Sequence, residues 1–163
     1  MNQSSKSNTA LFLMEMIVVI CFFSLVAVIC VRLFAAAGIA SDHSVDLNHA
    51  VRAEESLAEV WISCGGDLEK TAALFPQAQL GQDNRSPMNG TLTLYYDSEW
   101  QITGADSPAA YRITLAGTEA DAALIYGDEV TGQAVTAGIT AVLLEKDQTL
   151  CSLDVDHYIG GNP

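Results

Sequence analysis

The sequence has 163 residues, half of which are apolar, and its formal net charge at pH 7 is −13. Nearly all of the acidic excess follows Gly38, where 19 Asp and Glu residues stand against five Lys and Arg residues. A segment this acidic repels phosphate backbones, so we expect no direct nucleic-acid binding by the domain that it forms.

The first predicted element is an apolar helix that begins at Leu11. From Leu11 to Val31 the apolar run is interrupted by only one carboxylate, Glu15, and one hydroxyl, Ser24. A helix of this length spans roughly 30 Å, the thickness of the hydrocarbon part of a bilayer. We therefore predict a transmembrane helix over residues 11–37, preceded by a short polar leader over residues 1–10. An ionised carboxylate within a membrane segment is costly, which marks Glu15 as a functional residue.

The residues around the start of this helix resemble a known N-terminal motif. From Ala10 the chain reads ALFLMEMIVVI, which is similar to the start of a type IV prepilin or a type II secretion pseudopilin. In that family a dedicated peptidase removes a short polar leader ending in a small residue, usually Gly, and the fifth residue of the mature chain is glutamate. The resemblance implies cleavage between Ala10 and Leu11, N-methylation of Leu11, and a role for Glu15 in assembly and register.

Two other interpretations of the N-terminal segment are open. A cleaved secretory signal would use small residues near Ala35–Ala37 or Gly38–Ala40, and the mature chain would then begin near Ser41. Against it, the apolar run exceeds the usual length of about 7–15 residues, and Arg32 interrupts the approach to the cleavage site. A single-pass anchor would keep the whole segment, with Glu15 snorkelling to the membrane surface.

After Gly38 the pattern predicts an amphipathic helical region over residues 38–76. Apolar or small residues recur at spacings of three and four, at Ala50, Ala53, Leu57, Val60 or Trp61, and Cys64. Charged residues can lie off this stripe, namely Arg52, Glu54, Glu55 and Glu59. Gly65 and Gly66 predict the end of the helix, and Asp67 could cap a short second helix over Leu68–Phe75.

Residues 77–163 carry patterns typical of an antiparallel sheet of four to six strands. Gln77–Pro87 is polar and is expected to be a loop. Alternation with a period of two predicts strands at Thr91–Tyr96, Glu99–Thr103, Tyr111–Leu115, Ile139–Glu145 and Leu150–Tyr158. Thr118–Gly138 is ambiguous, with Ala122–Tyr126 as a candidate strand. With residues 38–76 the strands would form one α+β domain, in which the long N-terminal helix packs on the sheet.

Little in the sequence points to catalysis or to a bound metal, so we expect a protein that is not an enzyme and has no cofactor. His43 and His49 are six residues apart and do not share a helix face as an i, i+4 metal pair does. His157 stands alone. Asp154 and Asp156 alternate in a predicted strand, which is more typical of a solvated edge than of a calcium site.

The four cysteines divide between the two parts of the chain. Cys21 and Cys30 lie in the apolar run, where a cysteine behaves as a small hydrophobic residue. Cys64 and Cys151 lie in the domain. A domain outside the cell would permit a Cys64–Cys151 disulfide, which we predict; two unpaired thiols are the alternative.

With the resemblance, these features predict a structural subunit, major or minor, of a type IV pilus or of the pseudopilus of a type II secretion or DNA-uptake machine. The expected partners are the membrane, a prepilin peptidase and other pilin-like subunits in a filament. The chain would cross the inner (cytoplasmic) membrane once, with its C-terminal domain outside, and would enter an extracellular filament on assembly. The alternatives are an uncleaved membrane-anchored binding domain and a secreted enzyme with a cleaved signal peptide.

Overall fold

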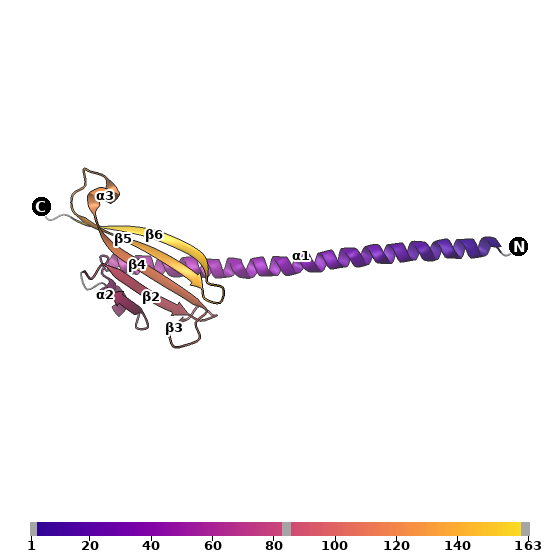
Figure 1. The fold of residues 1–163 in the computed structure, drawn as a ribbon, viewed down its shortest axis with the longest axis horizontal. Helices are drawn as coiled ribbons and strands as arrows, with labels where there is room; N and C mark the ends of the chain where they lie inside the picture. Colours follow the sequence, from indigo (N-terminus) through magenta and orange to yellow (C-terminus); the bar gives the residue numbers. More distant parts are fainter. Residues whose placement is uncertain (1–2, 83–85, 161–163) are drawn as a thin grey trace. The chain divides into compact units, whose positions relative to one another are not determined.

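The structure, a computed structural model, divides into two compact units between Ser44 and Val45. It describes the backbone of residues 3–82 and 86–160 and the side chains of residues 11–81 and 86–160. Helix α1, Gln3–Ser63, begins in the first unit and ends in the second (Figure 1). The second unit also contains two short helices and a six-stranded sheet. The predicted α+β arrangement, with the long N-terminal helix packed on an antiparallel sheet, is confirmed.

Helix α1 ends where the paired glycines predict. The Gly66 N–H donates to the Trp61 carbonyl (3.0 Å), and the Gly65 N–H donates to the Ile62 carbonyl (2.9 Å). This pair of bonds is the Schellman arrangement, which satisfies the last carbonyls of a helix and needs a left-handed residue. Gly65 and Gly66 have φ values of 69° and 80°, which glycine adopts without the cost that a Cβ imposes.

A short second helix, α2, follows at Leu68–Ala73 and ends two residues before the predicted Phe75. Asp67 caps it as predicted, because its Oδ1 accepts hydrogen bonds from the backbone N–H groups of Glu69 (2.9 Å) and Lys70 (3.0 Å). The Lys70 ammonium also lies 3.1 Å from the Asp67 carboxylate. The cap fixes the direction in which the chain leaves α1 and enters the sheet.

Six antiparallel strands form the sheet, in the spatial order β1-β2-β4-β5-β6, with β3 paired to β2. Their bounds are β1 Gln79–Gln82, β2 Gly90–Tyr96, β3 Ile102–Thr103, β4 Tyr111–Asp121, β5 Gln133–Leu143 and β6 Gln148–Gly160. The five strands predicted from alternation are all present, although Glu99–Thr103 is reduced to the two residues of β3.

Two predictions about this region are wrong. The expected loop Gln77–Pro87 contains β1, a polar strand that pairs with β2 from Gln79↔Thr93 to Gln82↔Gly90. The candidate strand at Ala122–Tyr126 is instead a helix, α3, whose first turn is capped by Asp121 through the Ala123 N–H (3.1 Å). An acidic cap followed by two alanines favours a helical turn over a strand.

The core of the second unit lies between one face of the sheet and the part of α1 after Val45. The sheet contributes alternate residues that are fully buried: Leu92, Leu94, Ile113, Leu115 and Ile139. The helix contributes small and large residues at spacings of three and four: Ala50, Leu57, Ala58 and Trp61. Burying each large apolar side chain stabilises the unit by about 1.5–3 kcal/mol.

The helix face that packs on the sheet includes a carboxylate that was expected to lie off it. Glu54 is only 2% exposed. It lies four residues after Ala50 and three before Leu57, so helical geometry places it in the middle of the buried stripe. The sequence prediction set Glu54 among the solvated charges because of its residue type, and the structure corrects that assignment. Of the predicted alternatives Val60 and Trp61, Trp61 is the fully buried residue.

Candidate functional site

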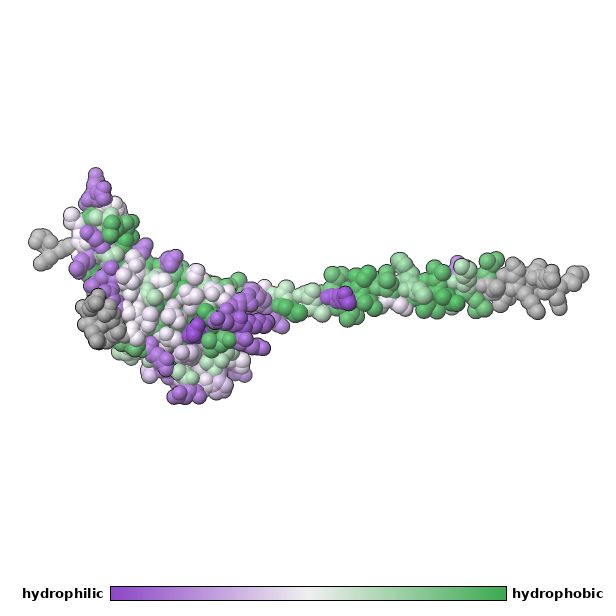
Figure 2. All heavy atoms as spheres, viewed as in Figure 1, coloured by the Kyte–Doolittle hydropathy of each residue, from purple (hydrophilic) through white to green (hydrophobic). Residues whose placement is uncertain are grey.

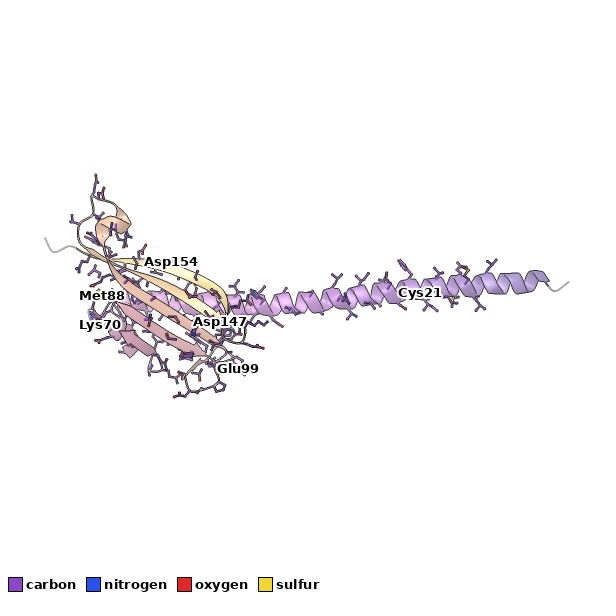
Figure 3. All side chains as sticks on the ribbon, in the orientation of Figure 1. Cys21, Lys70, Met88, Glu99, Asp147 and Asp154 are labelled. Carbon is purple, nitrogen blue, oxygen red and sulfur yellow. The ribbon has the colours of Figure 1, made fainter. Side chains whose placement is uncertain are left out.

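The first unit presents an apolar helical surface from Leu11 onward. Every side chain from Leu11 to Val45 is exposed in the single chain, and this helix is long and apolar enough to cross a membrane. Figure 2 shows the helix as mostly hydrophobic, with a strongly hydrophilic spot within the apolar run, and Figure 3 shows Cys21 projecting from it. The Ser24 hydroxyl donates to the Ile20 carbonyl (2.8 Å), so its polar group is satisfied within the helix.

Glu15 is the one carboxylate between Leu11 and Val31. It is exposed, and it has no ion-pair partner among the side chains that the structure describes. Leu11 lies one helical turn before Glu15, about 6 Å along the axis. The backbone of Ala10 is helical, but its side chain and those of the rest of the leader, residues 1–10, lie outside the described part of the structure. The cleavage and methylation predictions at Ala10 and Leu11 therefore stay predictions.

In the second unit, an aromatic cluster fastens the beginning of the α1 segment to the sheet. The Tyr111 hydroxyl donates to the Asp46 carboxylate (2.8 Å), and the Trp100 indole N–H lies 3.5 Å from the same oxygen. Burial, together with the Asp46 carboxylate, raises the pKa of Tyr111 to about 12. The phenol therefore stays protonated and keeps donating at any physiological pH.

The rings of the same cluster stack on one another. The Trp100 ring stacks on Tyr111 with a centroid separation of 4.0 Å, and His49 stacks on Trp100 at 5.6 Å. The positive φ of Trp100 (59°) belongs to a turn that Asp97 holds by accepting from Glu99 and Gln101 N–H groups. The cluster positions α1 on the sheet.

Deeper in the helix–sheet interface, Glu54 meets the sheet at a bulge. Cys151 pairs with Ala141 and Thr149 with Val142, so Leu150 is the extra residue of β6. The Glu54 carboxylate accepts hydrogen bonds from the Cys151 thiol and from the Ala141 N–H. Its Oε1 atom has no partner among the described residues.

The electrostatics of this contact favour the neutral forms of both side chains. Burial raises the pKa of Glu54, and the two hydrogen bonds offset only part of that effect. Burial and the nearby Glu54 carboxylate raise the pKa of the Cys151 thiol to about 12. A thiol of this kind is a poor nucleophile, because the thiolate is the reactive form.

The predicted Cys64–Cys151 disulfide is wrong for this structure, in which both cysteines are free. Gly66, two residues after Cys64, lies against Val135 of β5, whereas Cys151 pairs with Ala141 of the same strand. Six residues of extended strand separate those two positions, about 20 Å. A disulfide needs Cα atoms within about 7 Å of each other.

The structure brings no cluster of metal ligands together. Within the described residues no group of three or more His, Cys, Asp and Glu side chains could hold a metal ion. His43 is exposed on α1, His49 stacks on Trp100, and His157 lies half-buried on β6 opposite Val135. Asp154 and Asp156 are exposed on one face of β6, as their alternation predicts.

Sequence reasoning located Glu15 but missed the contacts of Glu54 and the link from Asp46 to Tyr111. The position of Glu54 within the apolar stripe was a signal that could have shown its burial. The hydrogen bond between Tyr111 and Asp46 joins residues 65 apart in sequence and leaves no local pattern.

The fold and the exposed helix define the class of this protein in physical terms. It is an α+β chain whose N-terminal helix contains a candidate membrane span in the first unit and packs on an antiparallel sheet in the second. No family model, no curated protein and no solved structure matches the chain.

Proposed function

We propose that the chain is a pilin-like structural subunit, which a prepilin peptidase processes and which assembles into a filament through α1. The observation that carries the proposal is Glu15, the one charged side chain of the apolar helical run Leu11–Val31, five residues after Ala10. The packing of the later part of α1 on an antiparallel sheet supports it, because the resemblance implies the same arrangement. The filament would belong to a type IV pilus, a type II secretion system or a DNA-uptake machine.

Processing would convert α1 into an assembly element. Cleavage between Ala10 and Leu11 leaves a new amine at Leu11, which members of this family then N-methylate. Before assembly the apolar surface lies in the membrane, and the acidic second unit lies outside the cell. Assembly exchanges lipid for the helices of neighbouring subunits, an exchange that costs little because both surroundings are apolar.

Glu15 would set the register between neighbouring subunits. An unpaired carboxylate in a filament core of low dielectric constant is strongly disfavoured. The N-terminal amine at Leu11 of an adjacent subunit is the natural counter-charge, since every subunit supplies one. A shifted helix would leave both charges unpaired, so pairing selects one axial position. Pairing of Glu15 with the amine of its own chain, one turn away, is the competing arrangement.

Two substitutions test this role. Glu15→Leu removes the charge and makes the run more apolar, and Glu15→Gln removes the charge at nearly constant shape. Both should keep the chain in the membrane fraction and reduce its amount in sheared filaments. Met16→Leu, which changes no charge at the next position, is the matched control. If both Glu15 variants enter filaments as well as the wild type, Glu15 is a snorkelling residue and the register role is wrong.

A further inference from the structure

The sheet of the second unit has an open edge along β6. This strand pairs with β5 on one side, and in residues 3–82 and 86–160 no strand lies along its other side. Figure 1 shows β6 at the border of the sheet. From Cys151 to His157 its ladder with β5 is regular over seven consecutive pairs, a length of about 23 Å. Such an edge presents unpaired backbone N–H and C=O groups to another chain.

The edge stretch of β6 carries only part of the usual protection of an edge strand. Natural edges are blunted by Lys and other charged side chains, by Pro, by bulges, or by a very short strand. Cys151–His157 reads CSLDVDH and contains neither Lys nor Pro; its carboxylates, Asp154 and Asp156, repel an acidic strand but not a basic one. The two irregularities of the β5–β6 ladder lie at its ends, at Gln133/Ala134 and Ala141/Val142. The stretch between them is therefore suited to pairing.

The two faces of this edge differ in chemistry. Leu153 and Val155 point to the core but are only half-buried, and a further strand beside β6 would cover them. Asp154 and Asp156 lie exposed on the opposite face, without an ion-pair partner in the described part of the chain. The Asp154 carboxylate lies over Gly138 of β5, at 3.5 Å from where a Cβ would be (Figure 3 labels Asp154).

These carboxylates oppose pairing between two copies of the chain. Directly opposite residues of paired strands point to the same face. Two β6 strands paired with matched faces would therefore place Asp154 and Asp156 of one copy beside those of the other, which is repulsive. A shift by one residue would turn both aspartates of one copy toward the apolar face of the other. These two registers disfavour a second copy of the chain, whereas the exposed carboxylates of Asp154 and Asp156 would attract a strand of the opposite charge.

We propose that the open edge of β6 binds an extended segment of a different protein, in which Lys or Arg alternates with apolar residues, and adds it to the sheet as a further strand. The basic side chains would pair with Asp154 and Asp156 on the outer face. The apolar side chains would cover Leu153 and Val155 on the inner face. The backbone would continue the ladder that ends at β6.

A peptide titration of the full chain in detergent micelles tests the proposal. The probe is a fluorescent eight-residue peptide in which Lys alternates with Val, and the comparison peptide has Glu in place of Lys. The Lys peptide should bind about tenfold more tightly and slow amide exchange across Cys151–His157. Asp154→Lys with Asp156→Lys should reverse the preference. Glu55→Lys with Glu59→Lys, the same charge change on the exposed face of α1, should leave it unchanged.

Backbone methylation separates strand addition from simple charge attraction. Two further Lys peptides carry N-methyl groups on either the Lys or the Val residues. Only alternate N–H groups of an added strand face its neighbour, so one of these peptides should lose binding and the other should keep it. Equal binding by both peptides, or no preference for Lys over Glu, would overturn the proposal. The proposal would also be overturned if, with no peptide added, the β6 amides became more protected from exchange as the chain concentration rises, because the occupant of the edge would then be a second copy of the chain.

Discussion

The Glu54 carboxylate lies against the Cys151 thiol where α1 packs on the bulged end of β6. Glu54 is almost fully buried, and its Oε1 atom has no hydrogen-bond partner within the described structure. Burial of a carboxyl group with an unsatisfied oxygen disfavours its ionised form, so the pKa of Glu54 is raised. The contact therefore makes the stability of the second unit depend on pH.

Replacing Glu54 by Gln should stabilise the domain increasingly as the pH rises. The folded-state pKa of Glu54 lies above its ordinary value of about 4.5, so above that pH the unfolded chain loses a proton that the folded chain keeps. The wild type then loses free energy of unfolding relative to Glu54→Gln, by at most about 1.4 kcal/mol per pH unit, until the pH passes the raised pKa. Urea unfolding of the full chain in micelles, followed by the fluorescence of Trp61 and Trp100, measures the difference from pH 4 to 8.

The matched control is Glu55→Gln, because Glu55 is the next residue and is exposed. Its difference from the wild type should not grow with pH. If the free energy of unfolding of Glu54→Gln relative to the wild type stays constant, or falls as the pH rises, then burial does not raise the pKa of Glu54.

All four cysteines should react with a thiol reagent in the denatured, unreduced chain. With Cys21 and Cys30 replaced by Ala, two reactive thiols should remain. If no reactive thiol is found in that variant, Cys64 and Cys151 form a disulfide after all. In the folded chain at pH 8, Cys151 should react at least about tenfold more slowly than Cys64, because its pKa is raised to about 12. Where Glu54 is ionised, its carboxylate adds to this effect, so Glu54→Gln should accelerate the reaction of Cys151 alone, and more so above the raised pKa of Glu54.

The elements that follow from local patterns were predictable, and those that depend on distant partners were not. Alternation located β2, β4 and β6 because one face of each packs on α1 and the other meets solvent. The strand β1 reads QLGQ and has little strand propensity of its own; pairing with β2 stabilises it.

The candidate site shows the same limit. Glu15 could be located because its signal, a charge in an apolar run, is contained in a few consecutive residues. The burial of Glu54 depends on Cys151 and on the bulge beside it, nearly 100 residues further along the chain. The sequence pattern also could not show that Gly66, two residues after Cys64, and Cys151 lie against positions of β5 that are six residues apart.

Gly66→Ala should destabilise the second unit by about 2–4 kcal/mol. Two effects add: the left-handed φ of 80° costs an alanine about 1–2 kcal/mol, and the new Cβ would overlap with the Val135 side chain. Gly65→Ala is the matched control, since Gly65 has a similar φ (69°) but open space around its Cβ position. Gly65→Ala should lower the free energy of unfolding by about 1–2 kcal/mol. Equal losses in urea unfolding would show that the contact with Val135 does not restrict residue 66.

The mass of the mature N-terminus tests the proposed function most directly. The chain is expressed in cells with an active prepilin peptidase, isolated from the membrane and from filaments, and digested for mass spectrometry. The account predicts an N-terminal peptide that begins at Leu11 and carries one methyl group. A chain that still contains residues 1–10 would contradict it and indicate an uncleaved anchor, and a chain that begins near Ser41 would indicate a secreted protein.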